Sequence, residues 1–273
     1  MRNVRRGHPA PPELVAEVRR RYELIGPSPL LETSRAQAAA LEARLGIPCR
    51  AAGRLWGPYP AEILDELRAA GATRLLSLPL APQSVHVYHA AVEAALGASA
   101  GSSLVRAPHW GSEPALIAAF TATIDAALGG LGADQAPAAT IVLTAHSLPA
   151  RVIAAGDPYE VEFRRSAELV AAAFRDRGHR VEIAFQSQGA TADVWIGPDY
   201  TDVLRALATQ GATAVVVSPI GFLAEHVETL YDLDVEGAAV AAGLGLRYAR
   251  ARAVGTRAEL VDALEAVARR ALG

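Results

Sequence analysis

The run TIVLTAHSLP at residues 140–149 decides the fold that this sequence predicts. Six apolar or β-branched residues end at position 145, and His146, Ser147 and Pro149 follow almost directly. A short apolar run bounded by turn residues is typical of a buried strand. In open α/β sheets, ligands bind beyond the carboxyl ends of the strands. His146 is therefore a candidate site residue, although a histidine held in a loop for structural reasons is the alternative.

Three further apolar runs follow this strand, and helical patterns separate them. The runs are expected to be strands at 180–185, 213–218 and 246–250, and the helices to cover 158–176, 200–209, 224–240 and 257–271. Short strands that alternate with helices predict parallel strands joined by right-handed crossovers. The chain from residue 137 to 273 is therefore expected to form one doubly wound half.

The same alternation precedes the first run. Strands are expected at 48–54, 74–80 and 103–107, and helices at 11–25, 33–45, 60–70, 86–97 and 113–129. Residues 129–139 are rich in Gly, Ala, Asp and Pro, which indicates a boundary. We therefore expect a first half at 1–136. It begins with a helix, whereas a doubly wound domain begins with a strand, so we expect its first strand to be missing.

Composition excludes several classes of protein. The formal net charge of −3 lacks the basic excess of a nucleic-acid-binding protein. A single cysteine, Cys49, excludes an internal disulfide and cysteine-rich zinc or iron–sulfur sites, and it suits a reducing cytoplasm. No charge-free apolar run reaches about 18 residues, so no transmembrane segment is expected. No glycine-rich phosphate-binding motif follows a strand.

A second informative run is SPIGFLAEHVETLYDLDVE at residues 218–236. His226 and Glu228 fall in the first turn of the expected helix, and Glu228, Asp232 and Glu236 recur at four-residue spacing on one helical face. A solvated acidic face is the ordinary interpretation of such a pattern. Apolar neighbours keep this acidic stripe narrow, however, so a path for a divalent cation and for protons is the functional interpretation.

The third run, FQSQGATADVWIGPD at residues 185–199, places one large aromatic in a loop after a strand. Trp195 is either part of the core, the commoner fate of a tryptophan, or the wall of a pocket for a flat ligand.

These three runs resemble the signatures of the ferrochelatase family, in the family's order and spacing. GDPYEVEFRRSAELVA (156–171) is similar to the helix after the family's histidine, and RNVRRGH, RRYELIGPSPLLETSRAQA and LPLAPQ resemble segments of its first half. The resemblance covers nearly the whole chain. It implies two flavodoxin-like halves with a cleft between them, in which Fe²⁺ is inserted into a porphyrin.

The resemblance also implies roles for single residues. His146 and Glu228 match the pair that accepts pyrrole protons and contacts the metal. His226, Asp232 and Glu236 match a path for metal and protons. The expected porphyrin contacts, some of them to propionates, are Arg5, Arg21, Tyr22, Ser28, Tyr88, Ser147 and Trp195. Fe²⁺ is a substrate here, so we expect no resident cofactor and no iron–sulfur cluster.

The substrate and the alternatives follow from the same motifs. QGATADVWIGPD is closer to the Gram-positive type of the family, which acts on coproporphyrin III, and four propionates suit several arginines. We expect a cytoplasmic monomer. A non-catalytic porphyrin or haem binder derived from a chelatase is the main alternative. A chelatase for cobalt or for a reduced tetrapyrrole and a generic doubly wound binding protein are the others.

Overall fold

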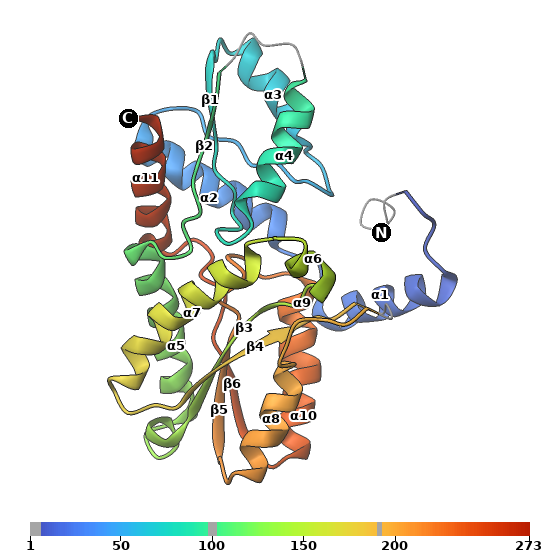
Figure 1. The fold of residues 1–273 in the computed structure, drawn as a ribbon, viewed down its shortest axis with the longest axis vertical. Helices are drawn as coiled ribbons and strands as arrows, with labels where there is room; N and C mark the ends of the chain where they lie inside the picture. Colours follow the sequence, from blue (N-terminus) through green and yellow to red (C-terminus); the bar gives the residue numbers. More distant parts are fainter. Residues whose placement is uncertain (1–6, 98–102, 190–192) are drawn as a thin grey trace.

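The computed structural model describes residues 7–97, 103–189 and 193–273, and they form an α/β fold with two parallel sheets (Figure 1). A two-stranded sheet lies toward one end of the long axis, and a four-stranded sheet lies toward the other. The predicted fold class, α/β with parallel strands in two sheets, is thereby confirmed.

The larger sheet contains β3 (Thr140–His146), β4 (Val181–Gln186), β5 (Ala214–Ser218) and β6 (Arg247–Arg250) in the order β4-β3-β5-β6. The earliest strand of the four is central, and the strand order reverses between β3 and β5, as in flavodoxin-like sheets. β3 is buried almost throughout because helices cover both faces of the sheet. Ligand sites form where the order of such a sheet reverses, which places His146 at the expected position.

The predicted helix over residues 224–240 is wrong in detail. The structure has a short helix α9 (Val227–Leu230), a π-helix (Asp232–Gly237) and α10 (Ala238–Gly243). The backbone N–H of Glu236 donates to the carbonyl oxygen of Tyr231 at 3.1 Å, five residues back instead of four. This wider turn inserts an extra residue, which a 3.6-residue sequence period does not reveal.

The other helices of this half lie close to their predicted positions. They are α6 (Ala150–Ala154), α7 (Tyr159–Arg175), α8 (Tyr200–Thr209) and α11 (Ala258–Leu272), of which only the short α6 was not predicted.

The first half of the chain forms the smaller sheet, from β1 (Arg74–Ser77) and β2 (Ser103–Arg106), and five helices. These are α1 (Pro12–Ile25), α2 (Leu30–Leu45), α3 (Pro60–Ala69), α4 (Val85–Leu96) and α5 (Pro114–Leu131), and a 3₁₀ turn (Ala136–Ala138) follows. The strand predicted at 48–54 is absent. The N–H of Cys49 bonds to the carboxylate of Glu42, and the N–H of Gly53 bonds to Pro58 O across a turn, so these groups cannot join a ladder.

Helix α5 packs against β5, β6, α7 and α11, so it covers the larger sheet although it precedes that sheet in sequence. Its buried side chains include Leu116, Phe120 and Ile124. It is the only helix among the described residues that is long and apolar enough to cross a membrane. Its place in the core explains its composition, so it is no clear transmembrane segment.

Helix α11, the last helix of the chain, packs against elements of both halves. It contacts α2, β1 and β2 of the first half as well as α5, and one hydrophobic cluster extends from Leu41 and Val85 to Leu264 (Figure 1). The division of the chain at residues 136/137 stays a prediction.

Candidate active site at the carboxyl end of β3

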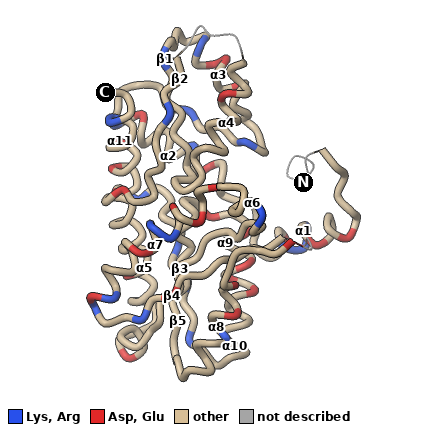
Figure 2. Tube along the Cα trace, viewed as in Figure 1, with Lys and Arg blue, Asp and Glu red and all other residues tan. Residues whose placement is uncertain are grey.

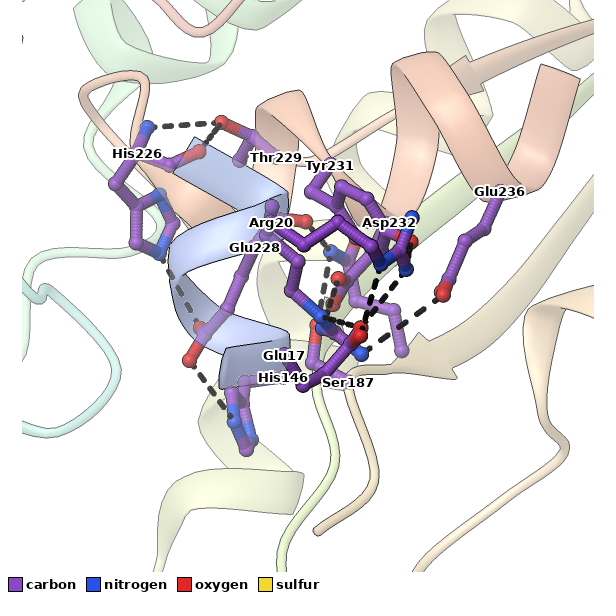
Figure 3. A network of polar contacts seen from close by, with 12 residues as sticks. Glu17, Arg20, His146, Ser187, His226, Glu228, Thr229, Tyr231, Asp232 and Glu236 are labelled. Carbon is purple, nitrogen blue, oxygen red and sulfur yellow. Dashed lines mark hydrogen bonds and ion pairs between the residues drawn. The ribbon is translucent and has the colours of Figure 1, made fainter. Parts of the chain in front are cut away.

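The structure brings His146 and Glu228 together (Figure 3). His146 ends β3, and Glu228 lies in the first turn of α9, beyond β5. His146 Nε2 is 3.6 Å from Glu228 Oε1, and the two side chains keep 31% and 36% of their surface exposed. Both groups therefore face space that a ligand can reach, and no packed apolar layer separates them.

The approach of the two segments depends on Gly221, in the turn after β5. Its N–H donates to the carbonyl oxygen of Thr144 at 3.1 Å. A Cβ at residue 221 would lie 2.5 Å from the Cβ of Ala145, closer than real Cβ contacts allow. Glycine is thus required for the loop that leads to Glu228 to lie against the end of β3.

The hydrogen bonds of His146 fix its tautomer. Its Nδ1 contacts the carbonyl oxygen of Ser147, which can only accept, so Nδ1 carries a proton. In the neutral ring, Nε2 then presents a lone pair toward Glu228. The Tyr159 hydroxyl donates to His146 O at 2.8 Å and holds the backbone. Burial disfavours the charged ring, but the nearby carboxylate of Glu228 outweighs it and raises the pKa of His146.

Hydrogen bonds hold both the side chain and the backbone of Glu228. One carboxylate oxygen lies 3.2 Å from His226 Nε2, and the Glu228 carbonyl accepts from Gln186 Nε2 at 2.9 Å. Gln186, at the end of β4, in turn accepts from the buried Thr144 hydroxyl at 2.7 Å. Burial alone would raise the pKa of Glu228, but the adjacent rings of His146 and His226 outweigh it and hold the pKa well below its usual range. Glu228 is therefore an anion at neutral pH.

An acidic surface, formed by Asp232 and Glu236, extends from this pair along the π-helix. Asp232 is buried and accepts a hydrogen bond from Ser187, while Arg21 of α1 lies 3.4 Å from Asp232 and 3.8 Å from Glu236. Burial and the charges of Glu228 and Glu236 raise the pKa of Asp232 to about 6, against the lowering effect of Ser187 and Arg21. Charged segments of both signs meet where α1 approaches α9 (Figure 2).

A cavity of about 230 Å³ opens on this acidic surface. Its lining residues are Arg21, Ser187, Gln188, Asp199, Tyr200, Thr201, Asp232 and Glu236. Ser187 has φ +60°, the left-handed region that is unfavourable for a side chain, and in that conformation its hydroxyl reaches Asp232. Because polar and charged groups line the cavity, it suits a small hydrated ligand better than a large apolar molecule.

The other residues singled out by sequence lie in different places. Tyr88 of α4 lies beside Arg54, whose guanidinium carbon is 5.9 Å from the centroid of the Tyr88 ring. Burial and the charge of Glu228 raise the pKa of Tyr88, against the effect of Arg54. Tyr22 and Ser28 lie on and after α1, and the Ser28 hydroxyl accepts from Leu30 N at 3.4 Å. Arg5 lies outside the described residues.

Two further expected substrate contacts, Ser147 and Trp195, also make contacts within the protein. The Ser147 hydroxyl is fully buried and donates to Ile196 O at 2.7 Å, so in this conformation it cannot reach a substrate. Trp195 forms a backbone bridge to Pro149, and its ring packs so closely on Gly189 that a Cβ there would lie 2.8 Å away. Both residues link the segment after β3 to the segment after β4.

A comparison with known protein families identifies the family of this chain. The ferrochelatase family model matches residues 11–272, nearly the whole chain. The chain belongs to the ferrochelatase family. It is therefore an enzyme of the lyase class, and the family's reaction is the insertion of iron into a porphyrin in haem biosynthesis.

Individual relatives agree with this ferrochelatase assignment. The chain is 34% identical to the ferrochelatase of Acidobacterium capsulatum, covering 100% of this chain and 88% of that protein. It is 32% identical to the coproporphyrin III ferrochelatase of Bacillus subtilis strain 168, covering 99% and 91%. The solved structure of SirB from Bacillus subtilis with Fe³⁺ has a TM-score of 0.65 at 16% identity and covers 89% of each chain, which shows the shared fold.

His146 and Glu228 are the two candidate metal-binding groups at this site. The described part of the chain holds no group of three or more His, Cys, Asp or Glu side chains arranged to bind a metal ion. An imidazole and a carboxylate suit Fe²⁺, but two ligands leave most of its coordination sphere to water or to the porphyrin.

Sequence reasoning missed the groups that hold the pair in place, namely Thr144, Tyr159 and Gln186. Gln186 pairs with His146 across the sheet and ends β4, so the rule that selected His146 applies to it equally. Tyr159 had no such signal, because its hydroxyl bond depends on how α7 packs on β3.

Proposed function

We propose that His146 and Glu228 are the proton acceptors and metal contacts of this ferrochelatase, and that coproporphyrin III is its porphyrin. The meeting of the two side chains at 3.6 Å, both partly exposed, carries the first proposal. The second is supported by the names of the relatives from Bacillus subtilis and Geobacillus thermodenitrificans, coproporphyrin III ferrochelatases that are 32% and 31% identical to this chain.

Metal insertion requires that two pyrrole N–H protons leave and that the ion loses water. The lone pair on His146 Nε2 accepts one proton, and the adjacent anion of Glu228 stabilises the imidazolium that forms. The same carboxylate supplies an oxygen ligand to the entering cation and takes the second proton. Binding energy spent on bending the ring would expose its nitrogens to this pair.

The acidic surface supplies the path in this proposal. His226 contacts Glu228 directly, and Asp232 and Glu236 lead from it to the cavity beside α1. A carboxyl group with a pKa of about 6 exchanges protons readily near neutral pH, which suits Asp232 to carrying protons away. The contacts of Arg5, Arg21, Tyr22, Ser28 and Tyr88 with the porphyrin remain part of the proposal.

Substitution of the pair tests the proposal. We expect His146→Ala and Glu228→Gln each to lower the rate of Fe²⁺ insertion at least about 100-fold, because each removes a proton acceptor at the reacting nitrogens. Porphyrin binding, followed by spectral titration with coproporphyrin III, should persist in both variants.

Two matched controls keep this test specific. His179→Ala removes an imidazole from the opposite end of the sheet, and Glu182→Gln neutralises a carboxylate on β4, so both should retain turnover. Near-normal turnover in His146→Ala would remove that residue from the mechanism. A wild-type protein that binds coproporphyrin III but never produces the metallated spectrum would favour a non-catalytic binder.

A further inference from the structure

A buried arginine outside the proposed pair connects the start of α9 with the π-helix, the two segments that carry Glu228, Asp232 and Glu236. Arg250 ends β6, and its side chain is only 3% exposed. Its Nε and Nη2 donate to the two carboxylate oxygens of Asp234 at 2.6 and 2.7 Å. Its Nη1 donates to both oxygens of Glu225 at 2.8 and 3.0 Å. The guanidinium group therefore bridges two carboxylates.

The Glu225 contact leads to the beginning of α9. Glu225 Oε2 accepts from the hydroxyl of Thr229 at 2.7 Å, and Thr229 is fully buried. The same hydroxyl oxygen accepts from the backbone N–H of His226 at 3.0 Å. Glu228 lies between His226 and Thr229, so the backbone on both sides of the proposed metal contact is tied to Arg250 through Glu225.

The Asp234 contact leads to the π-helix. Asp234 lies between Asp232 and Glu236, and its carboxylate is held by two parallel N–H···O bonds, the geometry in which arginine fixes orientation as well as charge. Arg250 therefore holds the π-helix from the side opposite to the cavity-facing acids. One rigid fork sets the spacing between α9 and the π-helix.

Stability alone is a poor explanation for this cluster. Removing charges from water costs several kcal/mol per ion, and a buried ion pair often stabilises no more than apolar residues of similar volume. Fixed geometry is what a planar, five-donor guanidinium provides and a flexible lysine does not.

We propose that Arg250 is a positioning residue, which sets the carboxylate of Glu228 relative to Asp232 and Glu236. The proposal rests on the roles proposed for Glu228 and the acidic surface. Each contact of Arg250 then serves a separate step. The contact with Glu225 serves proton removal and metal insertion at Glu228. The contact with Asp234 serves entry of the metal along the π-helix.

Single-contact variants test this separation with steady-state kinetics, varying Fe²⁺ at saturating coproporphyrin III. We expect Glu225→Gln to lower kcat about tenfold or more with little change in the KM for Fe²⁺. Asp234→Asn should raise that KM about fivefold or more and leave kcat within about threefold. Arg250→Met should do both, and Arg250→Lys should recover part of kcat because it restores charge without the fork.

Arg247→Met is the matched control, since it removes an arginine of the same strand whose guanidinium donates to Leu131 O, away from the site. Thermal unfolding of each variant separates folding from function. The proposal would be overturned if the variants of Arg250, Glu225 and Asp234 unfolded at lower temperature but kept kcat and KM values like those of Arg247→Met. It would also be overturned if Glu225→Gln and Asp234→Asn changed kcat and KM equally. If Arg250→Met does not fold, the two single-contact variants decide.

His146→Ala in the same assay distinguishes the two proposals. Turnover retained in His146→Ala contradicts the proposed pair itself. Turnover lost in His146→Ala but unchanged in Glu225→Gln, Asp234→Asn and Arg250→Lys contradicts the positioning role alone.

Discussion

At the scale of single residues, two neighbours decide what His146 can do. The Ser147 carbonyl assigns the proton to Nδ1, and Glu228 determines how readily Nε2 takes up a second proton. A partly buried imidazole beside a neutral group would have a lowered pKa, because burial disfavours the charged ring. Beside the Glu228 carboxylate the pKa is raised instead. The proton affinity of His146 is thus a property of the pair.

The pKa of His146 in Glu228→Gln should therefore fall below its wild-type value, measured by NMR titration of labelled histidine. Glu182→Gln, a control on β4, should leave it unchanged. The wild-type pair is stabilising at pH values above the ordinary pKa of a glutamate and below that of a histidine, and this contribution disappears as pH rises through the raised pKa of His146. The variant should accordingly lose more stability near pH 6 than near pH 9. An unchanged pKa in the variant would show that Glu228 does not act on His146.

Single residues were predictable where a general rule applies to them. The strand-end rule selected His146, and helical spacing selected Glu228, and the structure brings the two together. Ser147 adjoins His146 in sequence, yet its hydroxyl is buried against Ile196 O. Thr144 and Tyr159 were not predicted because their hydrogen bonds depend on which polar groups meet in three dimensions, whereas Gln186 ends a strand as His146 does and could have been selected by the same rule.

At the scale of elements, short apolar runs between breakers located β3 to β6 within one residue, since buried parallel strands have that pattern. The predictions failed where hydrogen bonding departs from regular periods. The backbone near Cys49 bonds to Glu42 instead of a strand, and the π-helix adds a residue that spacing alone cannot show.

Gly221→Ala tests the close approach that positions Glu228. The new Cβ would collide with Ala145, so we expect a loss of about 1–3 kcal/mol in the free energy of unfolding, together with reduced iron insertion. Urea denaturation measures the first effect. Gly130→Ala, in the last turn of α5 with open space around it, should be neutral or stabilising. Equal stability of the two variants would show that the contact at residue 221 is tolerated.

At the scale of the whole molecule, the two halves are joined by contacts that no local pattern predicts. Helix α5 covers the second sheet, α11 returns to the first, and the buried Gln37 of α2 donates to Leu223 O at 3.2 Å and Gly255 O at 2.7 Å. Amphipathic spacing locates such helices but does not say which sheet they cover. The sequence therefore predicts the two sheets better than the way in which they are joined.

Gln37→Ala tests this connection. Losing both hydrogen bonds and leaving a cavity should lower the free energy of unfolding by about 2–3 kcal/mol. Gln135→Ala removes an amide that donates to the exposed Asp134 and should change it by less than about 0.5 kcal/mol. Denaturant titration compares the two, and a similar small effect in both would mean that the Gln37 bonds contribute little to stability.

The position of α5 also bears on how the chain is made. This apolar helix leaves the ribosome before β5, β6 and α11, the elements that bury it, have been synthesised. Until then its Leu, Ile and Phe side chains remain open to other nascent chains, a state prone to aggregation. The polypeptide must therefore be nearly complete before this helix is protected from aggregation. Early termination of translation should yield insoluble fragments instead of a folded first half.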